Sequence, residues 1–170
     1  MTARVFLAAA ALAVPLALGG CGLHPIYAGG GSGVVARSLA AVEVKPIEGK
    51  AGWLIGNALR DRFAGDGSAP ARYRLDVTLD DHIEGLAVRS DYAATRERRT
   101  LRARFQLVRL DDQVTVLDAT AGSDAGLDVV GSEYATIAAE NSALERLSGI
   151  VADQITTRIA LYARRHAADR

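Results

Sequence analysis

The chain has 170 residues, and its 20 basic and 20 acidic side chains give a formal net charge of zero. This length suits one compact domain, and a composition of 49% hydrophobic and 24% charged residues is that of a globular protein, which excludes a disordered tail or a collagen-like fibre. Zero net charge removes the simplest argument for a nucleic-acid partner, and we expect none.

The first twenty residues are typical of a secretory signal peptide. Arg4 precedes an apolar run over residues 5–18, and these fourteen residues are too few to span a bilayer, which needs about twenty. Small residues follow the run, as they do at the cleavage site of a leader. We therefore predict that residues 1–20 are a lipoprotein signal peptide.

The only cysteine of the chain, Cys21, stands directly after these small residues. A single cysteine cannot form an intrachain disulfide, which leaves a buried thiol, an intermolecular disulfide or a lipid attachment point. The run Leu18-Gly19-Gly20-Cys21 resembles the bacterial lipobox, so we expect Cys21 to carry N-acyl and S-diacylglycerol groups, palmitate among them, as a membrane anchor. Gly22 takes the place of the aspartate that favours the inner membrane, so we expect the outer membrane.

Residues 21–38 are predicted to form a lipidated flexible tether, because residues 29–33 are four glycines and one serine. This glycine-rich run lacks the Gly-Lys-Ser/Thr ending of a phosphate-binding loop. Residues 39–170 are then a single domain.

The predicted elements of this domain follow from its hydrophobic periodicity. Alternation of apolar and polar residues favours strands over residues 39–46, from Tyr73 to Leu79, over 96–107 and over 114–121. The alternation changes parity between Leu79 and Leu86, which indicates a bulge near Gly85. Helical spacing favours helices over 51–64 and about 132–166. A tight connection is expected at 111–113. The order β-α-β-β-β-α predicts an α+β two-layer sandwich with a mixed, roughly four-stranded sheet and two helices on one face.

Eighteen of the 20 basic residues are arginines, and seven of these lie between Arg89 and Arg109 against two acids. Residues 96, 98, 102 and 104 share one face of the predicted strand, where like charges repel unless an anion or an acidic partner lies among them. Two interpretations remain open: a solvated face of an arginine-rich protein, or a site for a phosphorylated glycolipid or an acidic protein. The candidate anion-binding residues are Arg89, Arg96, Arg98, Arg102 and Arg104.

We find no catalytic constellation and no metal site in the sequence. His24, His82 and His166 are too scattered to form a ligand set, and the neighbouring carboxylates at 80–81 and 111–112 are typical of strands and turns. Nucleophile-elbow, zincin and dinucleotide motifs are absent from the sequence. We therefore expect no enzyme and no cofactor beyond the lipid on Cys21.

The opening CGLHPIY at residues 21–27, the lipobox, the predicted element order and the SEYA run at 132–135 together resemble the LptE family of lipopolysaccharide-assembly lipoproteins, in an alphaproteobacterial form. The resemblance implies a lipoprotein without turnover, lipid-anchored in the outer membrane, with its domain on the periplasmic side or within the lumen of the β-barrel LptD. There it would plug and help to assemble LptD and assist lipopolysaccharide delivery to the outer leaflet. Only Cys21 carries over from the family residue by residue.

Two other functions remain open at this point. A lipoprotein adaptor of another secretion or efflux complex could have the same fold, and it would differ in the complex with which it co-purifies. A small envelope hydrolase would show turnover that depends on an acidic residue or a histidine.

Overall fold

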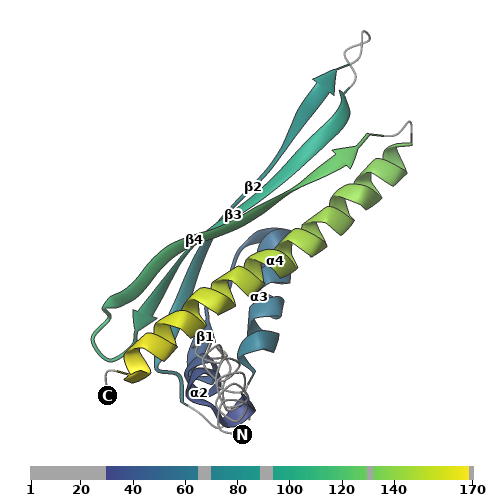
Figure 1. Ribbon diagram of the computed structural model, residues 1–170. Coiled ribbons are helices and arrows are strands. Elements are labelled where there is room, and N and C mark those ends of the chain that lie inside the picture. The colour runs from purple at the N-terminus through teal and green to yellow at the C-terminus, as the bar shows by residue number, and fades with distance from the viewer. Residues whose placement is uncertain (1–29, 65–69, 89–93, 130–131, 169–170) are drawn as a thin grey trace, which may run out of the picture.

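A computed structural model of the chain describes residues 30–64, 70–88, 94–129 and 132–168. Its elements are, in chain order, η2 (Gly30–Ser32), α2 (Val34–Ala40), β1 (Val42–Val44), α3 (Gly49–Phe63), β2 (Tyr73–Val88), β3 (Ala94–Arg109), β4 (Thr115–Asp128) and α4 (Glu133–Ala168). They form the predicted α+β fold, in which the helices lie on one side of a single sheet (Figure 1).

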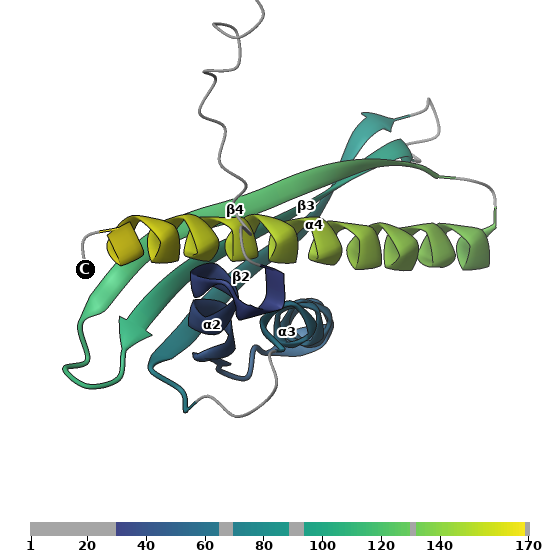
Figure 2. The ribbon, with the colours of Figure 1, turned by 60° about the horizontal axis from the view of Figure 1, so that its bottom comes forward.

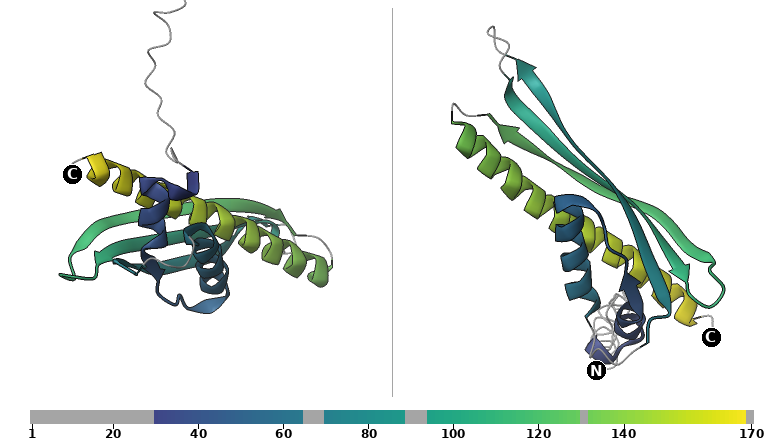
Figure 3. Two further views of the ribbon diagram at one scale, coloured as in Figure 1. Left: turned by 90° about the horizontal axis from the view of Figure 1, so that it is seen from below. Right: turned by 180° about the vertical axis from the view of Figure 1, so that it is seen from behind.

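The sheet has four strands in the order β1-β2-β3-β4, with β1 parallel to β2 and the other neighbours antiparallel. The prediction of a mixed sheet is confirmed. β1 has three residues, whereas β2 and β3 have 16 residues each, which is about 53 Å at ~3.3 Å per residue. The long strands therefore extend past α3 as a twisted arm, and α4 runs along it (Figures 1 and 3).

The bulge predicted near Gly85 is confirmed, because the register of β2 with β3 shifts between Gly85 and Ala87 and skips Leu86. β4 is longer than the predicted strand at 114–121 and continues to Asp128. Its second half is rich in Gly, Ser and Asp, which are poor strand formers. Residues 122–128 nevertheless form a strand because they pair with β3, and the backbone hydrogen bonds of this pairing offset their weak strand preference.

Two predicted helices are present, and a third helix was not predicted. α4 has 36 residues, about 54 Å at ~1.5 Å per residue, and agrees with the helix predicted at 132–166. α3 begins two residues before the predicted helix at 51–64. The third helix, α2, lies beside α3 and against the C-terminal half of α4 (Figure 2).

α2 shows that part of the predicted tether is wrong, since residues 34–38 are helical and residues 30–32 form a turn of 3-10 helix. It also shortens the strand predicted at 39–46 to Val42–Val44. Val35 and Leu39 lie one turn apart and are 5% and 4% exposed in the core. A seven-residue helix next to glycines has too weak a local signal to be seen in the sequence, and its stability comes from packing. Residues 1–29, with the predicted leader and Cys21, lie outside the described residues.

The core lies between the sheet and the helices. Its largest fully buried side chains come from all layers: Leu75, Leu101, Phe105 and Leu107 from the strands, Ile55 and Leu59 from α3, and Leu144, Leu147, Val151, Ile155 and Ile159 from α4. None of the described helices combines the length and the apolar composition that crossing a bilayer requires. No helix of the described chain covers the opposite side of the sheet, which carries mostly polar and charged side chains.

Candidate functional surface on the open face of the sheet

Two of the candidate residues, Cys21 and Arg89, lie outside the described residues. The other four form what we call the arginine stripe: Arg96, Arg98, Arg102 and Arg104, at alternate positions of β3. Leu101 and Ala103, which lie between the stripe arginines in the sequence, are 0% and 1% exposed and belong to the core on the helix side. The stripe therefore lies on the side of the sheet that faces away from the helices, here called the open face, as the alternation predicts.

Acidic side chains of the flanking strands lie among these arginines. The ion pairs join Arg104 to Asp118, Arg96 to Asp128 and Arg98 to Glu84, with N–O distances of 2.8, 3.1 and 3.6 Å. Charge repulsion along the stripe is thus compensated within the chain. The acidic partners that the sequence argument required for these three arginines therefore come from β2 and β4 of the same chain.

The pair between Arg104 and Asp118 is the most extensively hydrogen-bonded of the three. Arg104 donates to both carboxylate oxygens, at 3.2 and 2.8 Å, and Gln106 Nε2 donates to Asp118 Oδ2 at 2.8 Å. These hydrogen bonds lower the pKa of Asp118 from 3.8 to about 2, and the bond from Arg104 has the largest effect. The side chains are 66% and 38% exposed, so water screens the pair and either partner can exchange it for another ion.

Arg102 differs from the rest of the stripe, because no carboxylate in the described part of the chain pairs with it. Its register partners are Asp80 on β2 and Gly122 on β4. A Cβ atom on Gly122 would lie 2.6 Å from both Cδ and Nη1 of Arg102. The glycine thus allows the exposed guanidinium to lie across β4, where it remains available to an anion.

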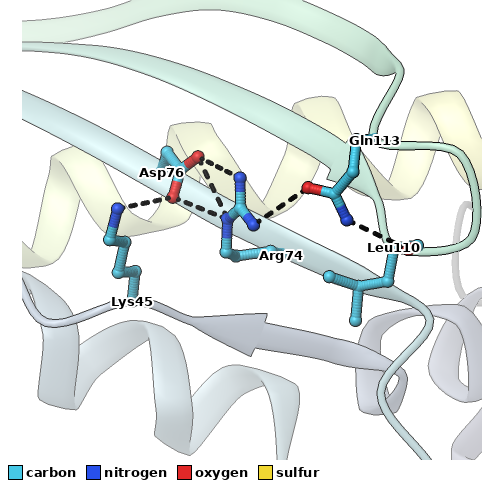
Figure 4. A network of polar contacts seen from close by, with 5 residues as sticks. All are labelled: Lys45, Arg74, Asp76, Leu110 and Gln113. Carbon is cyan, nitrogen blue, oxygen red and sulfur yellow. Dashed lines mark hydrogen bonds and ion pairs between the residues drawn. The ribbon is translucent and has the colours of Figure 1, made fainter.

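At the β1 end of the open face, a polar network fixes the surface (Figure 4). Arg74 donates to both oxygens of Asp76 from Nε and Nη2 at 3.1–3.2 Å, and Lys45 Nζ lies 3.8 Å from Asp76 Oδ1. Gln113 accepts a bond from Arg74 Nη1 and donates to the carbonyl of Leu110 at 3.0 Å. The tight connection predicted at 111–113 is confirmed, and it is tied to β2 through Arg74.

An arginine of β3 that the sequence analysis did not single out lies on the helix side of the sheet. Arg99 Nη2 is 2.6 Å from Asp81 Oδ2, and Arg99 Nη1 donates to the carbonyl of Glu140 in α4 at 3.0 Å. The bond to Asp81 raises the pKa of Arg99 against the opposing effect of burial. Its odd position among the apolar residues of β3 is the signal that could have identified it. Arg99 joins the arm to α4 and is structural.

The carboxylates and histidines that were weighed for catalysis are dispersed. Asp80 lies on the open face, whereas Asp81 points to the helix side, and residues 111 and 112 both pair with Arg109, at 3.2 and 2.7 Å. His82 is exposed on β2, and His166 Nδ1 donates to the carbonyl of Tyr162. Within the described ranges no group of His, Cys, Asp or Glu side chains could hold a metal ion.

Comparisons with known proteins agree with this architecture. Residues 39–159 match the model of the family described as "LptE: Lipopolysaccharide-assembly". A crystal structure of a lipoprotein from Caulobacter crescentus CB15 is similar with a TM-score of 0.65 and 24% identity, covering 81% of this chain and 98% of that chain. The minor lipoprotein from Acinetobacter baumannii is similar with a TM-score of 0.53 and 14% identity, covering 71% and 90%.

The two solved structures share the fold of this chain, and no curated protein matches its sequence. The family match covers most of the sequence and both layers of the fold, from the start of the sheet to the last buried turns of α4. The chain belongs to the LptE family of lipopolysaccharide-assembly proteins.

Proposed function

We propose that this protein is an outer-membrane lipoprotein, anchored through acyl groups on Cys21, that plugs the lumen of the β-barrel LptD, helps the barrel to assemble and assists lipopolysaccharide delivery to the outer leaflet. The observation that carries the proposal is the family match over residues 39–159. The protein acts by binding, without turnover.

The shape and polarity of the described domain support the role of a plug. Its long axis is set by strands of about 53 Å and a helix of about 54 Å. The sheet surface that the helices leave uncovered carries charged and polar side chains. The interior of a large outer-membrane barrel is polar and is commonly filled by a separate segment or domain. A polar open face can contact such a lumen without burying unpaired apolar surface.

The arginine stripe supplies the proposed contact with lipopolysaccharide. Arginine pairs with phosphate through two parallel hydrogen bonds, and Arg102 can do so without giving up a carboxylate of the described chain. Arg96, Arg98 and Arg104 can exchange their exposed carboxylates for phosphate. Arg89 belongs to the same proposed group.

Co-purification with an intact-mass measurement tests the proposal. The full-length protein is expressed in its native host with a C-terminal tag and purified from detergent-solubilised membranes. We expect a β-barrel of the LptD family in a one-to-one complex, and a mass that starts at Cys21 and includes three acyl chains. Recovery with a secretion or efflux complex would identify an adaptor, and an unmodified Cys21 thiol would contradict the anchor.

A further inference from the structure

A pocket of about 440 Å³ lies at the end of the domain where α2, the last turns of α4 and the start of β2 meet. Residues of α2 and of the C-terminal half of α4 line it, and these two helices lie side by side (Figures 1 and 2). The pocket lies on the helix side of the sheet, since core residues such as Leu107 and Ile159 line it, whereas the arginine stripe lies along β3 on the open face. It is thus separate from the proposed lipopolysaccharide contact.

The lining of this pocket combines an apolar wall with basic groups. Val34, Leu107, Ile159, Ala163 and the rings of Tyr73 and Tyr162 form the wall. Arg37, Arg72 and His166 also line the pocket, and no acidic residue does. In the described part of the chain no carboxylate pairs with Arg37 or Arg72. Unpaired guanidinium groups at an apolar cavity favour a ligand with an anionic head and an apolar tail.

We propose that this pocket binds the phosphate head group and the upper acyl chain of an anionic phospholipid. The choice of a phospholipid rests on the proposed anchorage at Cys21, which precedes Val34 by 13 residues. That length of chain spans at most about 45 Å, so an anchored domain keeps the pocket within reach of the leaflet. Bound there, the lipid adds a second attachment to the membrane, since one acyl anchor and a basic site act together.

The pocket volume agrees with partial insertion of a lipid. Ligand pockets of about 300–1,000 Å³ enclose a molecule of drug size, and 440 Å³ holds a glycerophosphate group with the first part of one chain. The remainder of the lipid would stay in the leaflet. Arg37 lies on α2 and Arg72 in the segment before β2, and both line the pocket, so the proposal places the phosphate between these two residues.

A binding experiment with water-soluble lipids tests the proposal. In the described part of the chain every core residue lies between Val35 and Ala163, so a chain that starts at Gly22 keeps all of them and carries no acyl group. Titration calorimetry below the critical micelle concentration then compares dihexanoyl phosphatidylglycerol with dihexanoyl phosphatidylcholine and glycerol 3-phosphate. We expect one phosphatidylglycerol per chain, with weaker binding of the other two probes.

Two variants remove the binding by different routes. Arg37→Glu with Arg72→Glu should weaken phosphatidylglycerol binding about tenfold or more. Ser38→Phe should fill the cavity without a change of charge, since Ser38 lines it. The matched control is Arg60→Glu with Arg146→Glu, exposed arginines outside the pocket, for which we expect a change within about twofold. Circular dichroism verifies that each variant is folded.

The proposal is overturned if phosphatidylglycerol does not bind, if the control loses as much affinity as the pocket variant, or if glycerol 3-phosphate binds equally well. The experiment distinguishes a wrong assignment of this pocket from a wrong proposal for the function of the protein. The pocket variant should retain lipopolysaccharide binding, and Arg102→Glu should retain phosphatidylglycerol binding.

Discussion

Residues of the open face act as pairs that bridge neighbouring strands. The alternation along β3 correctly predicted that residues 96, 98, 102 and 104 share one face. Their partners could not be predicted from that alternation, because Glu84, Asp118 and Asp128 come from other strands whose register with β3 decides which side chains meet. The availability of Arg102 likewise depends on a glycine opposite it, which only the register reveals.

The pair between Arg104 and Asp118 makes a prediction about pH. The pKa of Asp118 is about 2 in the folded protein, below its ordinary 3.8. The ion pair therefore contributes fully to the stability of the fold at pH values above 3.8, and this contribution is lost as the pH falls through about 2. In Arg104→Gln we expect the pKa of Asp118 to rise toward 3.8, measured by carboxyl NMR. Arg102→Gln is the control and should leave it unchanged. An unchanged pKa in Arg104→Gln would refute the assigned cause.

The lipopolysaccharide contact is tested by charge reversal on the same face. Arg98→Glu with Arg102→Glu should weaken binding of lipopolysaccharide by the soluble domain about tenfold or more, since charged hydrogen bonds contribute about 1.5–3 kcal/mol each. Arg60→Glu with Arg146→Glu changes the net charge equally away from this face. Equilibrium binding at moderate salt measures both variants. Equal affinities in the two variants would show that the stripe has no specific role.

At the level of elements, long periodic segments were predictable and short or irregular ones were not. α4 and the bulge in β2 were predicted because many residues contribute to each pattern. α2 and the second half of β4 were missed because packing and strand pairing hold them against weak local preference. The first five residues of α2 were consequently assigned to the tether.

The assignment of α2 to the core predicts a stability effect that a flexible tether would not show. Leu39 is 4% exposed, so Leu39→Ala should lower the free energy of unfolding by about 2–5 kcal/mol. Val34 on the same helix is 46% exposed, and Val34→Ala should change it by less than about 0.5 kcal/mol. Urea unfolding followed by circular dichroism measures both. A Leu39→Ala protein as stable as the parent would exclude α2 from the core.

Two helix glycines should respond in opposite directions to alanine. A Cβ atom on Gly149 of α4 meets nothing within 4 Å, so Gly149→Ala should stabilise the protein by about 0.5–1 kcal/mol. On Gly52 of α3 it would lie 2.5 Å from the carbonyl oxygen of Ile47, and Gly52→Ala should cost about 1–3 kcal/mol. Thermal unfolding distinguishes the two. Destabilisation by Gly149→Ala would contradict the open space at that position.

At the level of the whole molecule, the fold divides its surface into two unlike sides. The helix layer lies on one side of the sheet (Figure 3) and buries the core, and the other side is the open face with its charged pairs. The two-layer fold was predicted from the sequence because the strand and helix periods are distinct. The position of the pocket was not predictable, because its lining residues come from α2, β1, β2, β3 and α4 and the segment before β2, and only the folded chain brings them together.

Site-specific photocrosslinking in the native membrane tests the central claim, that the domain lies inside a barrel. A photoreactive residue is placed at Thr120 on the open face and, in a second protein, at Glu145 on the exposed side of α4. A domain enclosed by a barrel has wall on both sides, so both positions should crosslink to the same LptD-type protein. Crosslinks from one side only, or from both sides to a different envelope protein, would contradict the claim.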